Sequence, residues 1–218
     1  MKFLIKFPSR GRPDKFKLTF NRYLEFSSKK HDLFFVFTFD EDDSLMNNDD
    51  IRNFLAPHSS ICEINYGNSQ NKIEAINANL DNKTFDILIL ASDDLIPCRP
   101  QYDDIIAQDF EKYFPDTDGS MHYNNNMWGD KLDIMCILGY KYFKRFNYIY
   151  HPDYKSMHCD NEFTDVKNML NKNKFSLELI FDHHFTTNDA TASRNGIYYH
   201  HDHPLYQQRA ANKFGLEV

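Results

Sequence analysis

Two adjacent carboxylates, Asp93 and Asp94, directly follow an unbroken apolar run from Ile87 to Ala91. The run is too short for a helix and has polar residues on both sides, so it predicts a strand buried on both faces. Open α/β sheets bind ligands beyond the carboxyl ends of their strands. Mn²⁺ and Mg²⁺ prefer oxygen ligands and commonly bridge a carboxylate to substrate phosphates. The pair therefore indicates either a metal site for a nucleoside diphosphate or a solvated turn, in which Asp is common.

Charged side chains also follow two earlier predicted strands. Residues 2–7 form the first, and the loop after it carries Arg10 and Arg12. Guanidinium groups suit phosphates or base edges, although two solvated arginines would be equally ordinary on a loop. The apolar stretch 33–39 predicts a second strand, which Asp40 follows directly. Asp40 is placed to accept a hydrogen bond from a base or a ribose, or to be part of a solvated acidic loop.

Lys72 lies at the start of a predicted helix in which apolar residues recur at helical spacing. Asn68 or Ser69 is the expected N-cap. Free N–H groups and the helix dipole favour anions at such an end. Plain capping beside a solvated lysine is the alternative.

Further titratable groups lie in the second half of the chain. Asp160 and Glu162 begin another predicted helix, where carboxylates serve as caps or, in an active site, as a general base. His183 and His184 follow a predicted strand over 177–181. Imidazole there is a candidate metal ligand, although a lone histidine is more often structural.

The elements that must position these groups alternate between strand and helix in the first half. Such alternation predicts an α/β fold with a mostly parallel central sheet, and the length suits one domain over 1–218. We expect strands over 2–7, 33–39, 61–66, 87–91, 132–138 and 177–181, and helices from 14, over 49–55, from 72, over 102–113, over 141–146 and from 160.

Composition excludes several classes of protein. The net charge of −7 argues against a surface built mainly for nucleic acid phosphates. No apolar run is long enough for a membrane span, and the N-terminal residues are too few and too charged for a signal peptide. The four cysteines lack metal-site spacing, which favours reduced thiols in the cytoplasm. No G-x-G-x-x-G or Walker A sequence is present.

The segment 121–130 combines aromatic and amide side chains and contains the only tryptophan, Trp128. Such residues make platforms for a sugar or a base, or they are ordinary irregular packing.

In the order of these blocks the chain resembles small, single-domain GT-A-type glycosyltransferases related to family 2, of the kind found in bacterial and phage genomes. The resemblance covers nearly the whole chain. It rests on residues 8–13, Asp40, residues 67–77, Ser92-Asp93-Asp94, and residues 148–163 with the later histidines.

The resemblance implies a Rossmann-like GT-A fold with a nucleotide-sugar-binding half over 1–97 and an acceptor-binding half and C-terminal tail over 98–218. Ser92 replaces the first Asp of the usual metal-binding motif, so whether Asp93, Asp94 or both bind the metal stays open. The implied nucleotide contacts are Pro8, Ser9, Arg10, Arg12, Asp40, Lys72, Ser92 and Asp93. The implied metal ligands are Asp94 and either His183 or His184, and the implied base is Asp160, with Glu162 as its competitor.

The implied reaction moves a sugar from a nucleotide sugar, a UDP-sugar first among them, to an acceptor hydroxyl, with Mn²⁺ or Mg²⁺ and with inversion. The acceptor would be a glycan, another hydroxyl-bearing molecule or a modified DNA base, met in the cytoplasm, or in the host cytoplasm if the genome is viral. A metal-dependent phosphoesterase or nuclease, and a non-catalytic nucleotide-binding protein, are the alternatives.

Overall fold

The computed structural model describes residues 1–184 and 196–217. It has a seven-stranded sheet in the order β3-β2-β1-β4-β7-β6-β8 and a two-stranded sheet formed by β5 and β9. β1, β2, β3 and β4 are parallel, as are β6 and β8, and β7 is antiparallel to both of its neighbours. The expectation of an α/β fold with a mostly parallel central sheet is confirmed. Its strands are β1 (Lys2–Pro8), β2 (Asp32–Asp40), β3 (Cys62–Gly67), β4 (Ile87–Leu90), β6 (Ser120–Tyr123), β7 (Ile137–Gly139) and β8 (Asn173–Ser176).

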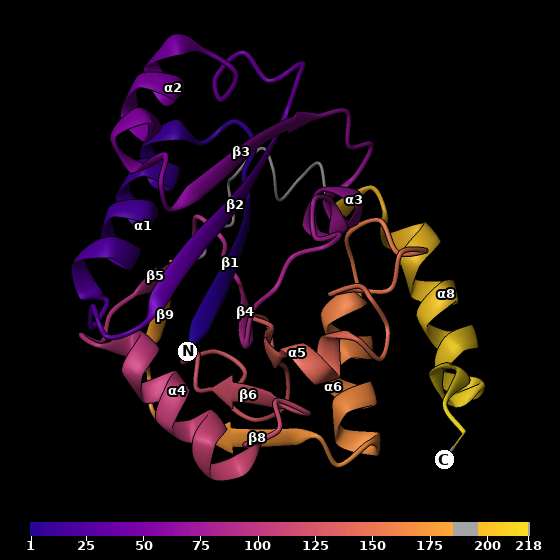
Figure 1. Cartoon of the computed structure of the whole chain (residues 1–218). Helices are drawn as coiled ribbons and strands as arrows, with labels where there is room; N and C mark the ends of the chain where they lie inside the picture. The colour runs from indigo at the N-terminus through magenta and orange to yellow at the C-terminus, as the bar shows by residue number, and fades with distance from the viewer. Residues whose placement is uncertain (185–195, 218) are drawn as a thin grey trace.

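Helices cover both faces of the large sheet (Figure 1). One face packs against α1 (Pro13–Phe26), α2 (Asp49–Leu55) and α4 (Tyr102–Tyr113), and Phe3, Ile5 and Phe7 of β1 point into this core. The other face packs against α3 (Lys72–Asn77), α5 (Tyr140–Phe143) and α6 (Cys159–Met169). The alternation along β1 thus divides its side chains between two cores, as a doubly covered sheet requires.

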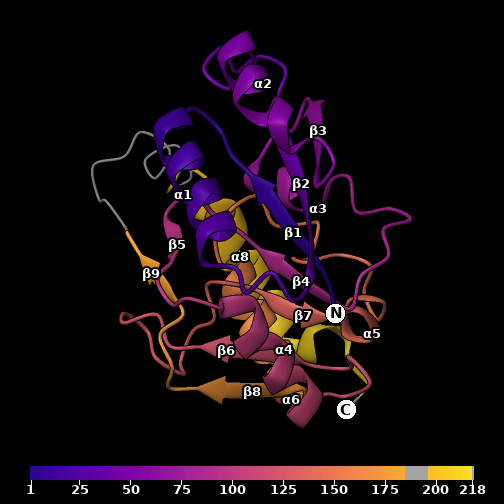
Figure 2. The ribbon, with the colours of Figure 1, turned by 60° about the vertical axis from the view of Figure 1, so that its left-hand side comes forward.

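The C-terminal helix α8 (Tyr199–Ala211) lies beside α6, on the outside of the second core (Figure 1). The remaining elements are β5 (Leu95–Pro97), β9 (Phe181–His183) and two short 3₁₀ helices, η1 (Ala56–His58) and η2 (Lys213–Gly215). Figure 2 shows β5 and β9 beside α1, away from the main sheet. None of the described helices is long and apolar enough to span a membrane.

Two predicted strands were misplaced. The range 132–138 is a strand only from Ile137, because Asp133 bends the chain: its side chain accepts a bond from Met135 N and pairs with the buried Lys167. The range 177–181 is mostly a connection between sheets, in which Leu177 is 82% exposed. The strands form instead at residues 173–176, which pair with β6, and at residues 181–183, which pair with β5. Pairing with these partners, and not local apolarity, determines where the strands lie.

Three other details differ from expectation. Asn71, not Asn68 or Ser69, caps α3, and its side chain accepts from the N–H groups of Ile73 and Glu74. The predicted helix over 141–146 is the shorter α5, which ends at Phe143, and the chain continues through turns to Asn147, which takes a left-handed conformation. The helix α8 and the strand β6 were not foreseen, since their residues are too polar to show a clear apolar period.

Candidate active site

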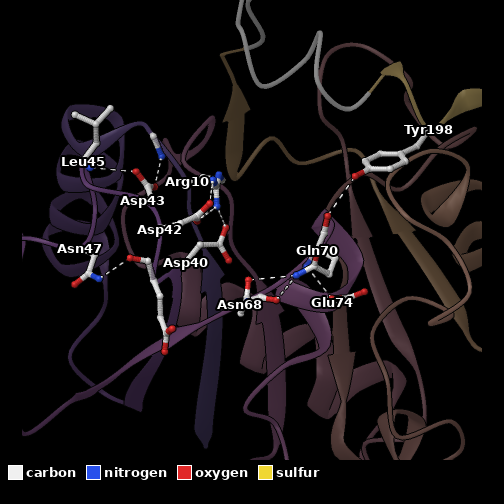
Figure 3. Close-up of polar contacts among 12 residues, drawn as sticks. Arg10, Asp40, Asp42, Asp43, Leu45, Asn47, Asn68, Gln70, Glu74 and Tyr198 are labelled. Carbon is white, nitrogen blue, oxygen red and sulfur yellow. Dashed lines mark hydrogen bonds and ion pairs between the residues drawn. The ribbon is translucent and has the colours of Figure 1, made fainter.

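The carboxyl ends of β1, β2 and β4 meet at one edge of the sheet, and the predicted donor residues gather there. Arg10 Nη1 lies 2.5 Å from Asp40 Oδ2, and both Arg10 nitrogens pair with Asp42 at 2.7 and 2.9 Å (Figure 3). The neighbouring Asp43 is buried and accepts a bond from Gly11 N at 2.7 Å. The sequence offered a solvated acidic loop after the second strand as one interpretation. In the structure Asp42 and Asp43, which belong to that loop, instead bind Arg10 and Gly11 of the loop after β1.

The facing side of this edge is the loop between β3 and α3. Gly67 is the register partner of Asp40, so the loop begins beside that carboxylate. Figure 3 shows Asn68 and Gln70 across from Arg10 and Asp40. Gln70 donates to the backbone and side-chain oxygens of Asn68, and Tyr198 donates to the Gln70 carbonyl at 3.2 Å.

Asp93 is a buried hub of this edge. Its carboxylate accepts from Ser9 Oγ at 2.9 Å and pairs with Arg12 Nη2 at 2.7 Å. Its carbonyl accepts from Thr19 of α1, so the first helix holds it from behind. Burial raises the pKa of Asp93 to about 6, against the lowering effect of the Arg12 charge.

Asp94 is more exposed than Asp93, with one-fifth of its side chain accessible, and Arg12 Nη1 lies 3.9 Å from its Oδ2. Ser92 donates to Asp94 Oδ1, and Asp94 Oδ2 lies 3.9 Å from Nε2 of His183. The antiparallel β5–β9 pair, in which Leu95 is opposite His183, creates this approach. His184 bonds Asp182 through its ring at 3.0 Å, so of the two histidines His183 lies at Asp94.

Asp94 and His183 could supply two ligands to a divalent cation. A carboxylate and an imidazole are acceptable ligands for Mn²⁺, and phosphate oxygens and water commonly complete such a site. Within residues 1–184 and 196–217, no group of three or more His, Cys, Asp or Glu side chains is arranged to hold a metal. A bound diphosphate and water would be suitable sources of the remaining ligands.

Lys72 is exposed at the start of α3, and its charge acts on two groups from other parts of the chain. Its charge acts to lower the pKa of His183, where burial is the larger cause, and that of Cys159, whose pKa burial raises. Lys72 therefore lies within electrostatic range of both the Asp94 corner and the start of α6. Pro8, at the end of β1, is half-buried.

The two candidate bases differ in their surroundings. Asp160 is half-buried in the first turn of α6 and accepts a bond from Asn161 N at 3.0 Å. Glu162 is buried, forms a bidentate pair with Arg209 at 2.7 and 2.8 Å, and accepts from the Tyr154 hydroxyl. Both Glu162 oxygens are thus occupied by groups of the protein itself.

The helix α8 fixes the loop that precedes α6, a role not visible in the sequence. Asp202 is fully buried and accepts from the backbone N–H groups of Lys155, Ser156 and Met157 at 3.0, 2.8 and 2.7 Å. The same helix supplies Arg209. Residues seven positions apart lie on one face of a helix. Had a helix been predicted here, the spacing of Asp202 and Arg209 would have indicated that both side chains point toward the same neighbour.

Two solved structures of similar fold are complexes with nucleotide sugars. The mannosyltransferase PcManGT from Pyrobaculum calidifontis, in complex with GDP-Man and Mn²⁺, aligns with a TM-score of 0.67 at 12% identity, covering 88% of this chain and 59% of that one. TarS 1–349 from S. aureus, in complex with UDP-GlcNAc, gives 0.64 at 14% identity, covering 88% and 61%. No protein-family model and no curated protein sequence matches the chain.

The chain spans about three-fifths of the length of these solved structures. Its seven-stranded, mostly parallel sheet with helices on both faces is the GT-A fold of these glycosyltransferases.

Proposed function

We propose that the protein is a glycosyltransferase that moves a sugar from a nucleoside diphosphate sugar, a UDP-sugar first among them, to an acceptor hydroxyl. The observation that carries the proposal is the convergence of Asp40, Asp93, Asp94 and His183 at one edge of a GT-A fold. Arg10, Arg12 and Lys72 supply positive charge around this edge, which suits a diphosphate leaving group. Ser92 and Ser9 orient the two carboxylates, and Pro8 ends the strand that presents the first loop.

In this mechanism Asp40 binds the nucleoside, and Arg10 must turn from Asp40 toward the donor. Asp94 and His183 would hold Mn²⁺ or Mg²⁺, which supplies charge neutralisation to the diphosphate. Asp160 accepts the acceptor's hydroxyl proton while that oxygen bonds to the anomeric carbon. The bond from that carbon to the diphosphate oxygen breaks, and its electron pair leaves with the nucleotide. This single displacement inverts the anomeric centre.

Asp160 is preferred to Glu162 as the base because Arg209 and Tyr154 already engage the Glu162 carboxylate. A two-metal phosphoesterase has less support, because the described residues contain no group of three or more His, Cys, Asp or Glu side chains that could hold a metal ion. A non-catalytic nucleotide-binding protein would keep the donor edge and have no use for Asp160.

A thermal-shift screen tests the donor site. We expect one of UDP, GDP, CMP and dTDP to raise the melting temperature in the presence of Mn²⁺, since a ligand at 100 times its Kd adds about 2.7 kcal/mol. Asp94→Ala should abolish the metal-dependent part, whereas Asp116→Ala, an exposed acid paired with Lys141, should leave it intact. No shift with any nucleotide would contradict the proposal.

The catalytic assignment needs a separate experiment with the nucleotide sugar that the screen identifies. Asp160→Asn should keep the nucleotide shift and reduce the rate of sugar transfer by at least about 100-fold, as expected for loss of a general base. Unchanged transfer by this variant would remove the base from Asp160 and open a retaining mechanism.

A further inference from the structure

The loop that connects β6 to β7 carries an exposed tryptophan next in sequence to a methionine that contacts His183. Trp128 is 48% exposed and Met127 is 49% exposed. Met127 Sδ lies 3.1 Å from Nδ1 of His183, whose Nε2 faces Asp94. Trp128 is therefore the direct chain neighbour of a residue that touches a proposed metal ligand.

The loop is held in this shape by its own amides. Asn125 is 5% exposed, and its Oδ1 accepts from the N–H groups of Met127 and Trp128 at 3.0 and 2.9 Å. Asn124 accepts from Asn126 N at 3.1 Å, and the Trp128 carbonyl accepts from Lys131 N at 3.1 Å. A buried amide that fixes the backbone under an exposed indole makes a preorganised platform, which lowers the entropy cost of binding.

We propose that Trp128 is the acceptor subsite and stacks on a pyranose ring of a neutral carbohydrate acceptor. This inference rests on the proposed function, because in a transferase the acceptor must lie next to the sugar that leaves the metal-bound diphosphate. The C–H groups on one face of a pyranose carry partial positive charge and are attracted to the negative face of an indole. The amides of the same loop suit the hydroxyl groups around that ring.

Charge and composition favour a neutral glycan over other acceptors. The exposed Asp130 and Lys131 next to Trp128 offset each other's charge, and the chain has a net charge of −7, so this loop offers no positive field to attract a nucleic acid or an anionic lipid surface. A lipid tail would need a broader apolar surface than one indole and one thioether set among three asparagines.

The test uses the full-length protein with Mn²⁺ and the nucleotide that stabilises it. On an array of immobilised neutral and acidic glycans, the wild type should bind a neutral glycan. Trp128→Ala should bind it at least about tenfold more weakly, which corresponds to about 1.4 kcal/mol, and Trp128→Phe should fall between the two. Leu18→Ala removes a side chain of α1 with similar exposure, 52%, and should bind as the wild type does.

Because Trp128 is the only tryptophan, its emission reports contact directly. The soluble form of the bound glycan should change the fluorescence of the wild type in a saturable way. Equal binding by Trp128→Ala, the absence of any neutral glycan bound by the wild type, or an emission change only with phosphatidylcholine–phosphatidylglycerol vesicles would overturn the proposal.

The nucleotide shift separates this inference from the function it rests on. If nucleotide and Mn²⁺ raise the melting temperature of the wild type but it fails the glycan tests, only the proposal of a Trp128 subsite is contradicted. If no nucleotide raises the melting temperature of the wild type, the proposed transferase function itself is contradicted. Trp128→Ala should keep the full nucleotide shift, which also shows that the variant folds.

Discussion

Asp93 and Asp94 are neighbours in the chain, yet the fold gives their side chains different burial and different hydrogen-bonding partners. Asp93 is 2% exposed and binds Ser9 and Arg12, so it ties the first loop to the end of β4. Asp94 remains partly exposed and faces His183. Their adjacency in a turn after a strand forces this division, because successive side chains point in different directions. We expect Asp93 to orient the loop and Asp94 to hold the cation.

Lys6 is a second residue whose surroundings have a measurable effect. It lies fully buried in β1, donates to Thr38 Oγ1 and to the Ala78 carbonyl, and burial lowers its pKa to about 7. An unfolded lysine keeps its proton up to about pH 10.4. Between these two pKa values unfolding takes up a proton, so stability rises with pH.

This predicts a pH dependence that one substitution removes. Between pH 7.5 and 8.5 the free energy of unfolding of the wild type should increase by about 1 kcal/mol relative to Lys6→Met, because one proton per pH unit is worth about 1.4 kcal/mol. Urea denaturation at the two pH values measures it, with the exposed Lys144→Met as control. An identical pH slope in Lys6→Met and the wild type would show that Lys6 does not titrate in this range.

Among the elements, α8 acts on α6 through polar contacts more than through apolar packing. Asp202 holds the backbone before α6, Tyr206 donates to Asp165 at 2.6 Å, and Arg209 pairs with Glu162. Asp160 lies in the turn that these contacts fix. The geometry of the proposed base therefore depends on a helix near the C-terminus.

Arg209→Ala should destabilise the protein by about 2–3 kcal/mol, because it leaves the buried Glu162 carboxylate without its cation. The cost is set below that of a fully buried pair because Arg209 is 20% exposed. In urea denaturation, the double variant Glu162→Gln with Arg209→Met should recover part of the loss. If the single and double variants were equally destabilised, loss of packing and not an unpaired charge would be the cause.

Helices and strands differ in how far the sequence could predict them. The runs that became β1, β2 and β4, and the spaced Phe16, Phe20 and Tyr23 of α1, follow local patterns, and all these elements were predicted. The ends of these strands also placed Arg10, Arg12 and Asp40 at one edge. The short strands β8 and β9 could not be predicted, because their positions depend on distant partners, β6 and β5. For the same reason the choice between His183 and His184 stayed open until the pairing of β9 was known.

At the scale of the whole molecule, all four cysteines are free thiols, and only Cys98 is exposed. Cys62, Cys136 and Cys159 are buried, and burial raises the pKa of each thiol. The chain thus depends on packing and not on disulfide cross-links.

A thiol-specific dye such as Ellman's reagent should therefore titrate one thiol in the native protein and four in denaturant. The Cys98 pKa is itself raised by burial and by nearby Asp182, so the native reaction should accelerate as the pH rises above 8. Cys98→Ser should leave no fast-reacting native thiol. Any fast-reacting thiol in the Cys98→Ser variant would mean that a core cysteine becomes accessible by local opening.

The pairing of β5 with β9 also has a consequence for the order in which the molecule is completed. Leu95 and His183 are register partners, although nearly the whole second half of the chain separates them. Closing so long a loop is costly and is rewarded only once β6, β7 and β8 are in place. During synthesis from the N-terminus, Asp94 can therefore meet His183 only after β6, β7 and β8 have been made. Metal-dependent nucleotide binding would then mark the last step of maturation, and a refolding experiment that follows both intrinsic fluorescence and nucleotide binding should find that the binding signal arrives no earlier than the fluorescence.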